Sequence, residues 1–315
     1  MLIIDTDYIR IGIDVDQPDT LYSSLLKSFP RRYIPDYTVF LDKNREFDSL
    51  IKWILQGNGF KVVNIELGGN IERFVIRSPI PQPYISESPV FFLLQVMART
   101  YARKGYIVFT DTAAVYLDGK TVLLMGYPHT GKSTLSALAL AYGYIPLSTE
   151  NTVVEIQDDK ARIVSGTPIL VYDPRIEKLF NIRIDYDEKT KHGYRIVDLD
   201  KHVPERKKIL RKKPEIDSIF ILHCSYRSGN PDLEPVRGRK IKKTLWYFAT
   251  ALLKGMDYYE PYPLDLTDNR IETMLGENID KMGRIYGEKI HEVYGRHDKV
   301  YKTIIDLIGA GGGSS

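Results

Sequence analysis

The spacing of apolar and polar positions predicts a small α/β unit at the start of the chain. Apolar residues alternate with polar ones in short runs, and this period of two is typical of β-strands. The sequence Gly68-Gly69-Asn70 lies between two such runs and marks a tight turn. The elements predicted here are strands at residues 8–15 and 37–41, a short helix at 48–55, and a hairpin formed by 62–67 and 73–77.

A segment with three prolines, Pro79, Pro81 and Pro83, predicts a linker after this unit. Beyond it, residues 88–103 predict a helix that is apolar on almost every face, and such a helix belongs in the interior of a larger domain. The domains we expect are a small N-terminal α/β domain at residues 1–85, a larger domain at 86–308 whose last part (267–308) is largely helical, and a flexible tail at 309–315.

The larger domain contains a phosphate-binding motif. Residues 126–134 read GYPHTGKST and match the pattern G-x-x-x-x-G-K-[S/T], with a strand-like apolar run before it and helical spacing after it. In that setting the loop amides bind phosphate, Lys132 reaches the β- and γ-phosphates, and Ser133 offers its hydroxyl to Mg²⁺. The residues expected to contact the nucleotide are Gly126, Thr130, Gly131, Lys132, Ser133 and Thr134.

The elements around the motif point to a particular kind of nucleotide-binding protein. Two strands within residues 105–117 and an Asp-Gly turn lead into the strand before the loop, which differs from a regular alternation of strands and helices. Residues 105–156 resemble the core of the HPr kinase/phosphorylase-like proteins, which share a fold with phosphoenolpyruvate carboxykinases, and residues 216–253 match more weakly. The resemblance implies an α/β fold of this P-loop type, with ATP and Mg²⁺ as cofactors. The matching elements are the small-residue strand at 113–115, the turn at 118–120, the phosphate loop and the return at 143–148.

The carboxylates depart from the pattern of that family. Its members usually carry two aspartates after the return, one that helps to hold Mg²⁺ and one that acts on the acceptor hydroxyl. Here residues 148–152 read STENT, so Glu150 takes the place of one aspartate, and Thr149 or Asn151 takes the place of the other. Relatives tend to have a histidine near the start of the small-residue strand, where this chain has Asp111. Asp111 either restores the missing carboxylate in space or caps a turn.

Further basic and acidic residues are candidates for the same site. Arg227 follows an apolar strand, and Arg237 and Arg239 begin an amphipathic helix, so each is a candidate to contact the phosphates. Asp198 or Asp200 would replace Glu150 as the metal-binding acid if residues 196–200 formed the Walker B strand of a motor ATPase. The short apolar stretch before these aspartates disfavours that interpretation.

Composition and charge narrow the classes of partner and the location that the sequence allows. The chain has 315 residues and a net charge of +3, and its basic runs at 201–213 and 237–243 lack the interleaved aromatic residues of a single-strand nucleic-acid surface, which disfavours nucleic acid as a partner. There is no apolar run of the length that spans a membrane, and the acidic N-terminus differs from a signal peptide, so the sequence predicts a cytoplasmic protein with no membrane partner. The single cysteine, Cys224, lies in an apolar run and is expected to be buried and inert.

These features predict an ATP-dependent kinase. Phosphoryl transfer requires positioning, a metal between the phosphates, positive charge and a carboxylate near the acceptor, and Lys132, Ser133, Glu150 and Asp111 supply these groups. The acceptor would be a hydroxyl of a small molecule or of a protein serine, and a homo-oligomer is compatible with the sequence. The alternative is a nucleotide-binding regulatory or assembly protein with weak or no phosphoryl transfer.

Overall fold

The structure is a computed structural model that describes residues 1–42, 46–227, 229–255 and 263–309. The chain divides into two compact units, Met1–Val108 with Thr250–Leu275 and Phe109–Ala249 with Gly276–Ser315. Both combine helices with mixed sheets, which confirms the α/β class. The division falls after Val108, whereas the sequence placed a boundary near residue 85. Apart from Gly309, the expected tail lies outside the described residues.

The first unit is built on a six-stranded mixed sheet with the order β3-β1-β2-β4-β6-β5. The pairs β2/β4 and β4/β6 are parallel and the others are antiparallel, so the hairpin expected from β5 and β6 is confirmed. The elements of the sheet and its first helices are β1 (Leu2–Thr6), β2 (Ile9–Val15), α1 (Pro18–Leu25), α2 (Ser28–Tyr33), β3 (Thr38–Leu41), β4 (Ser49–Leu55), β5 (Lys61–Glu66) and β6 (Glu72–Ser78).

The helix expected at residues 48–55 is wrong, because this segment forms strand β4 in the middle of the sheet. Its side chains alternate: Ser49, Ile51 and Trp53 are buried, and Lys52 between them is exposed. A central parallel strand carries apolar residues on both of its faces. Over so short a run, that pattern is hard to distinguish from the apolar stripe of a helix.

The apolar helix expected at residues 88–103 is α3 (Ser88–Arg103), which is buried over nearly its whole length. It packs on the sheet of the first unit, with Thr100 Oγ1 2.9 Å from Ser49 Oγ and the ring centroids of Phe92 and Phe74 5.9 Å apart. The helix therefore belongs to the first unit and not to the interior of the unit that carries the phosphate-binding motif. Its sequence predicted burial correctly but did not indicate which sheet would bury it.

The second unit contains another six-stranded sheet, with the order β10-β8-β9-β16-β18-β17. Its central strands β9, β16 and β18 are parallel, and the outer pairs are antiparallel. The expected turn between β8 and β9 is confirmed, because Asp118 and Gly119 both have positive φ. The strands are β8 (Thr112–Leu117), β9 (Lys120–Met125), β10 (Ile145–Ser148), β16 (Ser218–Ser225), β17 (Asp232–Pro235) and β18 (Ile290–Arg296).

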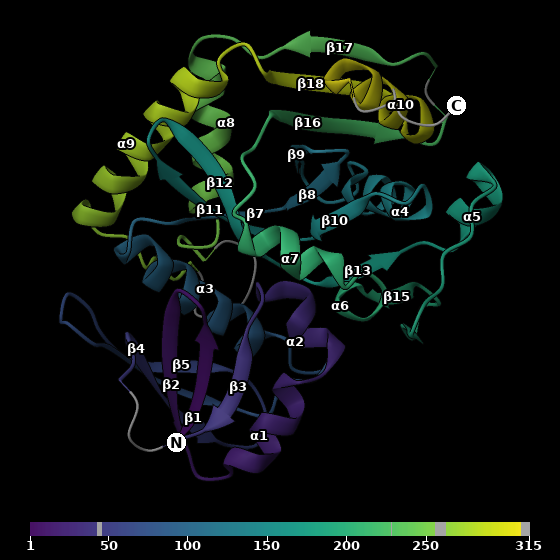
Figure 1. The fold of residues 1–315 in the computed structure, drawn as a ribbon. Coiled ribbons are helices and arrows are strands. Elements are labelled where there is room, and N and C mark those ends of the chain that lie inside the picture. The colour runs from purple at the N-terminus through teal and green to yellow at the C-terminus, as the bar shows by residue number, and fades with distance from the viewer. Residues whose placement is uncertain (43–45, 228, 256–262, 310–315) are drawn as a thin grey trace. The chain divides into compact units, whose positions relative to one another are not determined.

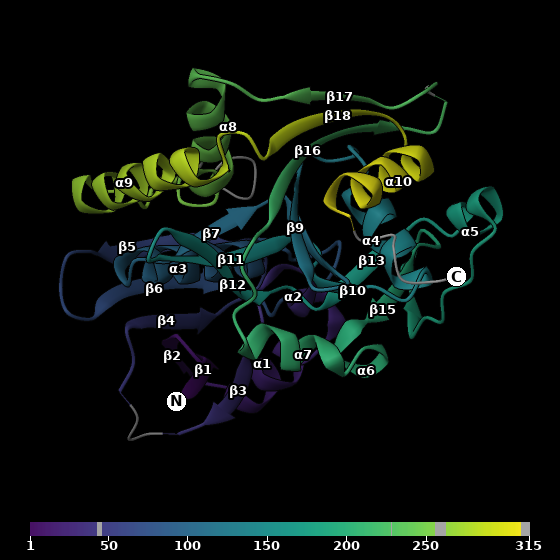
Figure 2. The same cartoon turned by 45° about the horizontal axis from the view of Figure 1, so that its top comes forward.

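Helices cover both faces of this sheet. On one face, α4 (Lys132–Ala141) and α10 (His297–Ile308) form an apolar core with β8, β9, β16 and β18 (Figure 1). Helix α8 (Arg239–Thr250) and the end of α9 (Asn269–Tyr286) lie on the opposite side (Figure 2). Strand β18 falls within the segment that the sequence predicted to be largely helical. None of the helices in the described part of the chain has the length and apolar character needed to cross a bilayer.

Two three-stranded sheets complete the second unit, with the orders β12-β11-β7 and β13-β15-β14. Residues 168–194 contribute two strands and a short helix to this region. The remaining elements are β7 (Ile107–Thr110), β11 (Asn151–Gln157), β12 (Lys160–Gly166), β13 (Ile169–Tyr172), α5 (Arg175–Phe180), β14 (Glu188–Lys189), β15 (Arg195–Asp198), α6 (Leu199–His202) and α7 (Glu205–Arg211).

Candidate functional site

The glycine loop, residues 126–131, connects β9 to α4 and is held against the end of β16. The backbone N–H of Cys224 donates to the carbonyl of Thr130 at 2.9 Å. Gly131 has φ +112°, and a Cβ at this position would lie 2.7 Å from Cβ of Cys224. A Cβ on Gly126 would lie 2.2 Å from Oγ1 of Thr130. Both glycines are therefore required by close packing and, at Gly131, by the left-handed backbone.

The thiol of Cys224 is buried beneath this loop. Burial raises the pKa of Cys224 to about 12, so the thiol remains protonated and a poor nucleophile at neutral pH. The expectation of a buried, unreactive cysteine agrees with this environment. Its contribution is to fill the space that Gly131 leaves beside β16.

Lys132 points back into the glycine loop, and its side chain is only 5% exposed. Its ammonium donates to the carbonyl of Gly126 and, at 3.1 Å, to that of Tyr127, and its Nζ lies 3.6 Å from Oδ1 of Asp111. Burial lowers the pKa of Lys132, although the charges of Asp111 and Glu150 oppose this shift. The loop therefore encloses a buried cation whose carboxylate partner is at the long end of ion-pair distances.

Asp111 and Glu150 occupy two places where the chain passes directly between the six-stranded sheet of the second unit and the sheet β12-β11-β7. Asp111 alone separates β7 of one sheet from β8 of the next, and Glu150 lies in the two-residue connection between β10 and β11. The N–H of Thr112 donates to the carbonyl of Glu150 at 3.0 Å, and the N–H of Gly126 donates to the carbonyl of Asp111 at 3.2 Å. These two hydrogen bonds join both crossings to the start of the glycine loop.

The electrostatics of Asp111 reflect this arrangement. Burial raises the pKa of Asp111, Lys132 lowers it, and the negative charge of Glu150 raises it, with a net increase above the usual value of 3.8. Asp111 also has φ +50°, a left-handed conformation that an aspartate adopts at some cost. The structure thus brings Asp111, Glu150 and Lys132 into one electrostatic group, as the idea of a carboxylate restored in space requires.

Thr167 holds the backbone around Glu150. Its Oγ1 accepts hydrogen bonds from three consecutive N–H groups, those of Thr149 at 3.1 Å, Glu150 at 2.8 Å and Asn151 at 3.3 Å. The hydroxyl of Thr149 donates in turn to the carbonyl of Ile169 at 2.7 Å. Thr167 is fully buried. Sequence reasoning missed it, because a threonine between two strands carries no signal that it binds a segment 17 residues away.

The other expected nucleotide contacts lie in the first turn of α4. Ser133 is half-buried and Thr134 is buried there, directly after Lys132. Among the described residues no group of three or more His, Cys, Asp or Glu side chains could hold a metal ion. A magnesium ion that accompanies a nucleotide commonly takes one or two carboxylates, with phosphate oxygens and water as the other ligands. Ser133 and Glu150 are the residues that fit such a role.

The three candidate arginines lie at different ends of the sheet. Arg227 is exposed and follows the end of β16, on the same edge as the glycine loop. Arg237 and Arg239 are at the opposite end, since the N–H of the neighbouring Val236 donates to Ile290 at the start of β18. The structure therefore brings Arg227 to the edge of the site but not Arg237 or Arg239. Sequence reasoning placed these two at a helix start but could not know which end of the sheet that helix start occupies.

Asp198 and Asp200 serve other parts of the second unit. Strand β15, which precedes them, belongs to a separate small sheet and not to the sheet of β9. Oδ1 of Asp198 accepts the N–H of Asp200 at the start of α6, and Asp200 pairs at 2.7 Å with the fully buried Arg206. These contacts engage both carboxylates in another part of the unit, whereas Asp111 and Glu150 are the acids whose charges act on Lys132.

Comparison with protein-family models and with curated proteins finds no match to this sequence. The resemblance to HPr kinase-like proteins therefore stays a prediction from the residues and their order around the glycine loop.

Proposed function

We propose that this protein is an ATP-dependent kinase that transfers a phosphoryl group to a hydroxyl of a small molecule or a protein serine. The observation that carries this proposal is the position of Lys132, a buried ammonium enclosed by a glycine loop between a strand and a helix, with two carboxylates beside it. Phosphate oxygens are stronger partners for such an ammonium than the two carbonyls that accept its hydrogen bonds.

The roles of the residues follow from their places. The amides of the glycine loop and the N-terminus of α4 would bind the phosphates, with Lys132 on the β- and γ-phosphates and Arg227 at the edge. Ser133 and Glu150 would hold Mg²⁺, which neutralises charge on the phosphate oxygens when it is bound. In the reaction the acceptor oxygen forms a bond to the γ-phosphorus while the bond to the β-phosphate oxygen breaks, and ADP leaves. Asp111 would take the proton of the acceptor hydroxyl.

A transfer experiment with labelled nucleotide tests this function. The protein with γ-labelled ATP and Mg²⁺ should move label to a hydroxyl acceptor from a panel of sugars, polyols, hydroxy amino acids and serine-containing proteins. Glu150→Gln should still bind ATP but lose transfer by about a hundredfold or more, because the amide keeps the shape and loses the charge. Glu155→Gln, five residues further along β11, is the matched control and should leave transfer unchanged. Full transfer by Glu150→Gln would contradict the assignment.

The alternative function is nucleotide binding without transfer, in a regulatory or assembly protein. The observation that favours it is the sequence at 148–152, which offers one carboxylate where the family has two. In that case ATP would bind with an affinity that depends on Lys132, and label would move to no acceptor or only to water.

A further inference from the structure

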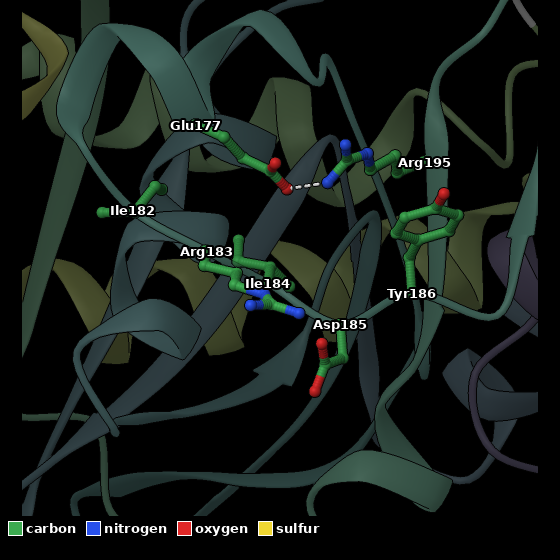
Figure 3. A pocket seen from close by; sticks show the side chains of 7 residues that line it. All are labelled: Glu177, Ile182, Arg183, Ile184, Asp185, Tyr186 and Arg195. Carbon is green, nitrogen blue, oxygen red and sulfur yellow. Dashed lines mark hydrogen bonds and ion pairs between the residues drawn. The ribbon is translucent and has the colours of Figure 1, made fainter.

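A pocket of about 650 Å³ opens in the second unit between α5 and β15. Its volume lies within the range of small-molecule sites. Figure 3 shows the side chains around it, which come from α5, from the extended segment after it and from β15. The lining residues are Glu177, Ile182, Arg183, Ile184, Asp185, Tyr186 and Arg195.

One wall of this pocket is held in place by its own contacts. Glu177 forms an ion pair with Arg195, drawn as a dashed line in Figure 3, and accepts a hydrogen bond from the hydroxyl of Tyr172 at 2.7 Å. Burial raises the pKa of Tyr172, so that hydroxyl stays protonated and can donate. The guanidinium of Arg195 also lies 4.5 Å from the ring centroid of Tyr186. These charges are thus already paired within the wall.

Arg183 and Asp185 differ from the wall. Both are exposed, and neither side chain forms a hydrogen bond or an ion pair with any residue in the described ranges. The buried Ile184 lies between them in sequence, and Ile182 and Tyr186 flank them. The pocket therefore presents one free positive and one free negative group beside apolar surface, with no net charge.

We propose that this pocket binds a free α-amino acid as its zwitterion. The guanidinium of Arg183 accommodates the carboxylate, and the carboxylate of Asp185 accepts hydrogen bonds from the ammonium. The apolar part of the ligand lies against Ile182, Ile184 and the ring of Tyr186. A simple anion would meet Asp185 and a simple cation would meet Arg183, whereas a zwitterion pairs with both groups.

Calorimetric titration of the full chain, without nucleotide, tests the pocket. The probes are L-serine, L-leucine and L-phenylalanine, each also as its N-acetyl form, which lacks the ammonium, and as its amide, which lacks the carboxylate. At least one unmodified amino acid should bind with a Kd below about 1 mM, and either modification should weaken binding by about tenfold or more. Absence of binding by all three amino acids would overturn the proposal. Equal binding of the N-acetyl form would indicate a plain anion site and would overturn it as well.

Two variants assign the charges. Arg183→Gln should weaken binding of the amino acid about tenfold and leave binding of its amide unchanged, because the amide lacks the carboxylate. Asp185→Asn should also weaken binding of the amino acid about tenfold but leave binding of its N-acetyl form unchanged, because that form lacks the ammonium. Lys178→Gln, on the exposed surface of α5 outside the lining, is the control and should change nothing. Variants that weaken all three forms equally would overturn the assigned roles. Because no nucleotide is needed, failure here is separable from failure of the proposed kinase activity.

Discussion

Arg99 of the first unit and Lys132 of the second unit are both buried cations, but their surroundings differ. In the first unit Arg99 is 1% exposed, and its guanidinium bonds to both carboxylate oxygens of Glu72 at 2.7 and 2.6 Å, to Asp268 at 2.6 Å and to the carbonyl of Leu266. In the second unit Lys132 is about as buried but has two loop carbonyls and a carboxylate at 3.6 Å. The guanidinium of Arg99 is fully engaged by two carboxylates and a carbonyl, whereas the ammonium of Lys132 contacts groups that a ligand could replace.

This comparison distinguishes a cation that stabilises the fold, Arg99, from one that we propose binds a ligand, Lys132. A buried charge is tolerated when geometry and hydrogen bonds satisfy it, and removal of one partner leaves the other uncompensated. Arg99 joins α3 and β6 to the segment around residues 266–268, which returns from the C-terminal part of the chain. Its bonds are therefore expected to determine stability. Those of Lys132 are expected to determine ligand binding.

The largest effect is predicted at Arg99. Arg99→Met should lower the free energy of unfolding by about 3–5 kcal/mol, because it leaves Glu72 as a buried carboxylate without its main partner. Urea unfolding followed by circular dichroism measures this change. Arg10→Met, which removes an exposed arginine paired with Asp5 on the same sheet, is the control and should leave the midpoint nearly unchanged. Equal effects of the two substitutions would contradict the structural role of Arg99.

Lys132→Ala should show the opposite profile. Since burial lowers the pKa of Lys132, its charged form is disfavoured in the folded protein, and its removal at neutral pH should not lower stability by more than about 1 kcal/mol. ATP affinity should fall by about a hundredfold, close to 2.7 kcal/mol, as measured by calorimetry. Lys120→Ala at the other end of β9 is the control. Unchanged ATP binding in Lys132→Ala would remove the basis for a nucleotide site.

The raised pKa of Asp111 predicts that transfer and stability both depend on pH. Its pKa is raised, so the base form appears only above the usual range of aspartate, and transfer should fall as pH drops through that raised pKa. Asp111→Asn should remove this dependence and reduce kcat by about a hundredfold. The same raised pKa means that stability is lost as pH rises through it, so the variant should be slightly more stable at neutral pH.

Combination with Glu150→Gln tests whether the two carboxylates act as a unit. The double variant should be little worse than either single one, because residues that act together are not additive. Multiplied losses in kcat would show that Asp111 and Glu150 work independently. An unaltered pH profile in Asp111→Asn would show that another group accepts the proton.

Sequence reasoning was most reliable where local chemistry dictates structure. The strand, glycine loop and helix around Lys132, and the Asp-Gly turn before them, follow from residue types at fixed spacing, and the secondary structure agrees. It failed where long-range packing decides, as at strand β4 and in the burial of α3 in the first unit. The proximity of Asp111 to Glu150 was only one of two interpretations, because a sheet crossing depends on contacts distant in sequence. Thr167 gave no signal at all.

The last prediction concerns Thr167, which acts on Glu150 through the backbone. The hydroxyl of Thr149 donates its hydrogen to the carbonyl of Ile169, so we infer that the hydroxyl of Thr167 donates to Oγ1 of Thr149. The same Oγ1 of Thr167 accepts hydrogen bonds from the N–H groups of residues 149–151. Thr167→Val keeps the shape but removes the oxygen that accepts hydrogen bonds from these three N–H groups, which should cost about 1–3 kcal/mol of stability. Transfer should fall about tenfold in kcat, with ATP affinity unchanged, because Glu150 is displaced and not removed.

Thr167→Ser is the matched variant, since it restores the hydroxyl and loses only a methyl group. It should recover most of the transfer rate even though the lost methyl group leaves a small cavity at a fully buried site. If Thr167→Val and Thr167→Ser had equally low transfer rates, the cause would be packing and not the hydroxyl. If Thr167→Val transferred phosphate as fast as the parent, the position of Glu150 would not depend on this hydrogen-bond network. Lys132 and Asp111 would then be the residues of the site whose contacts determine function.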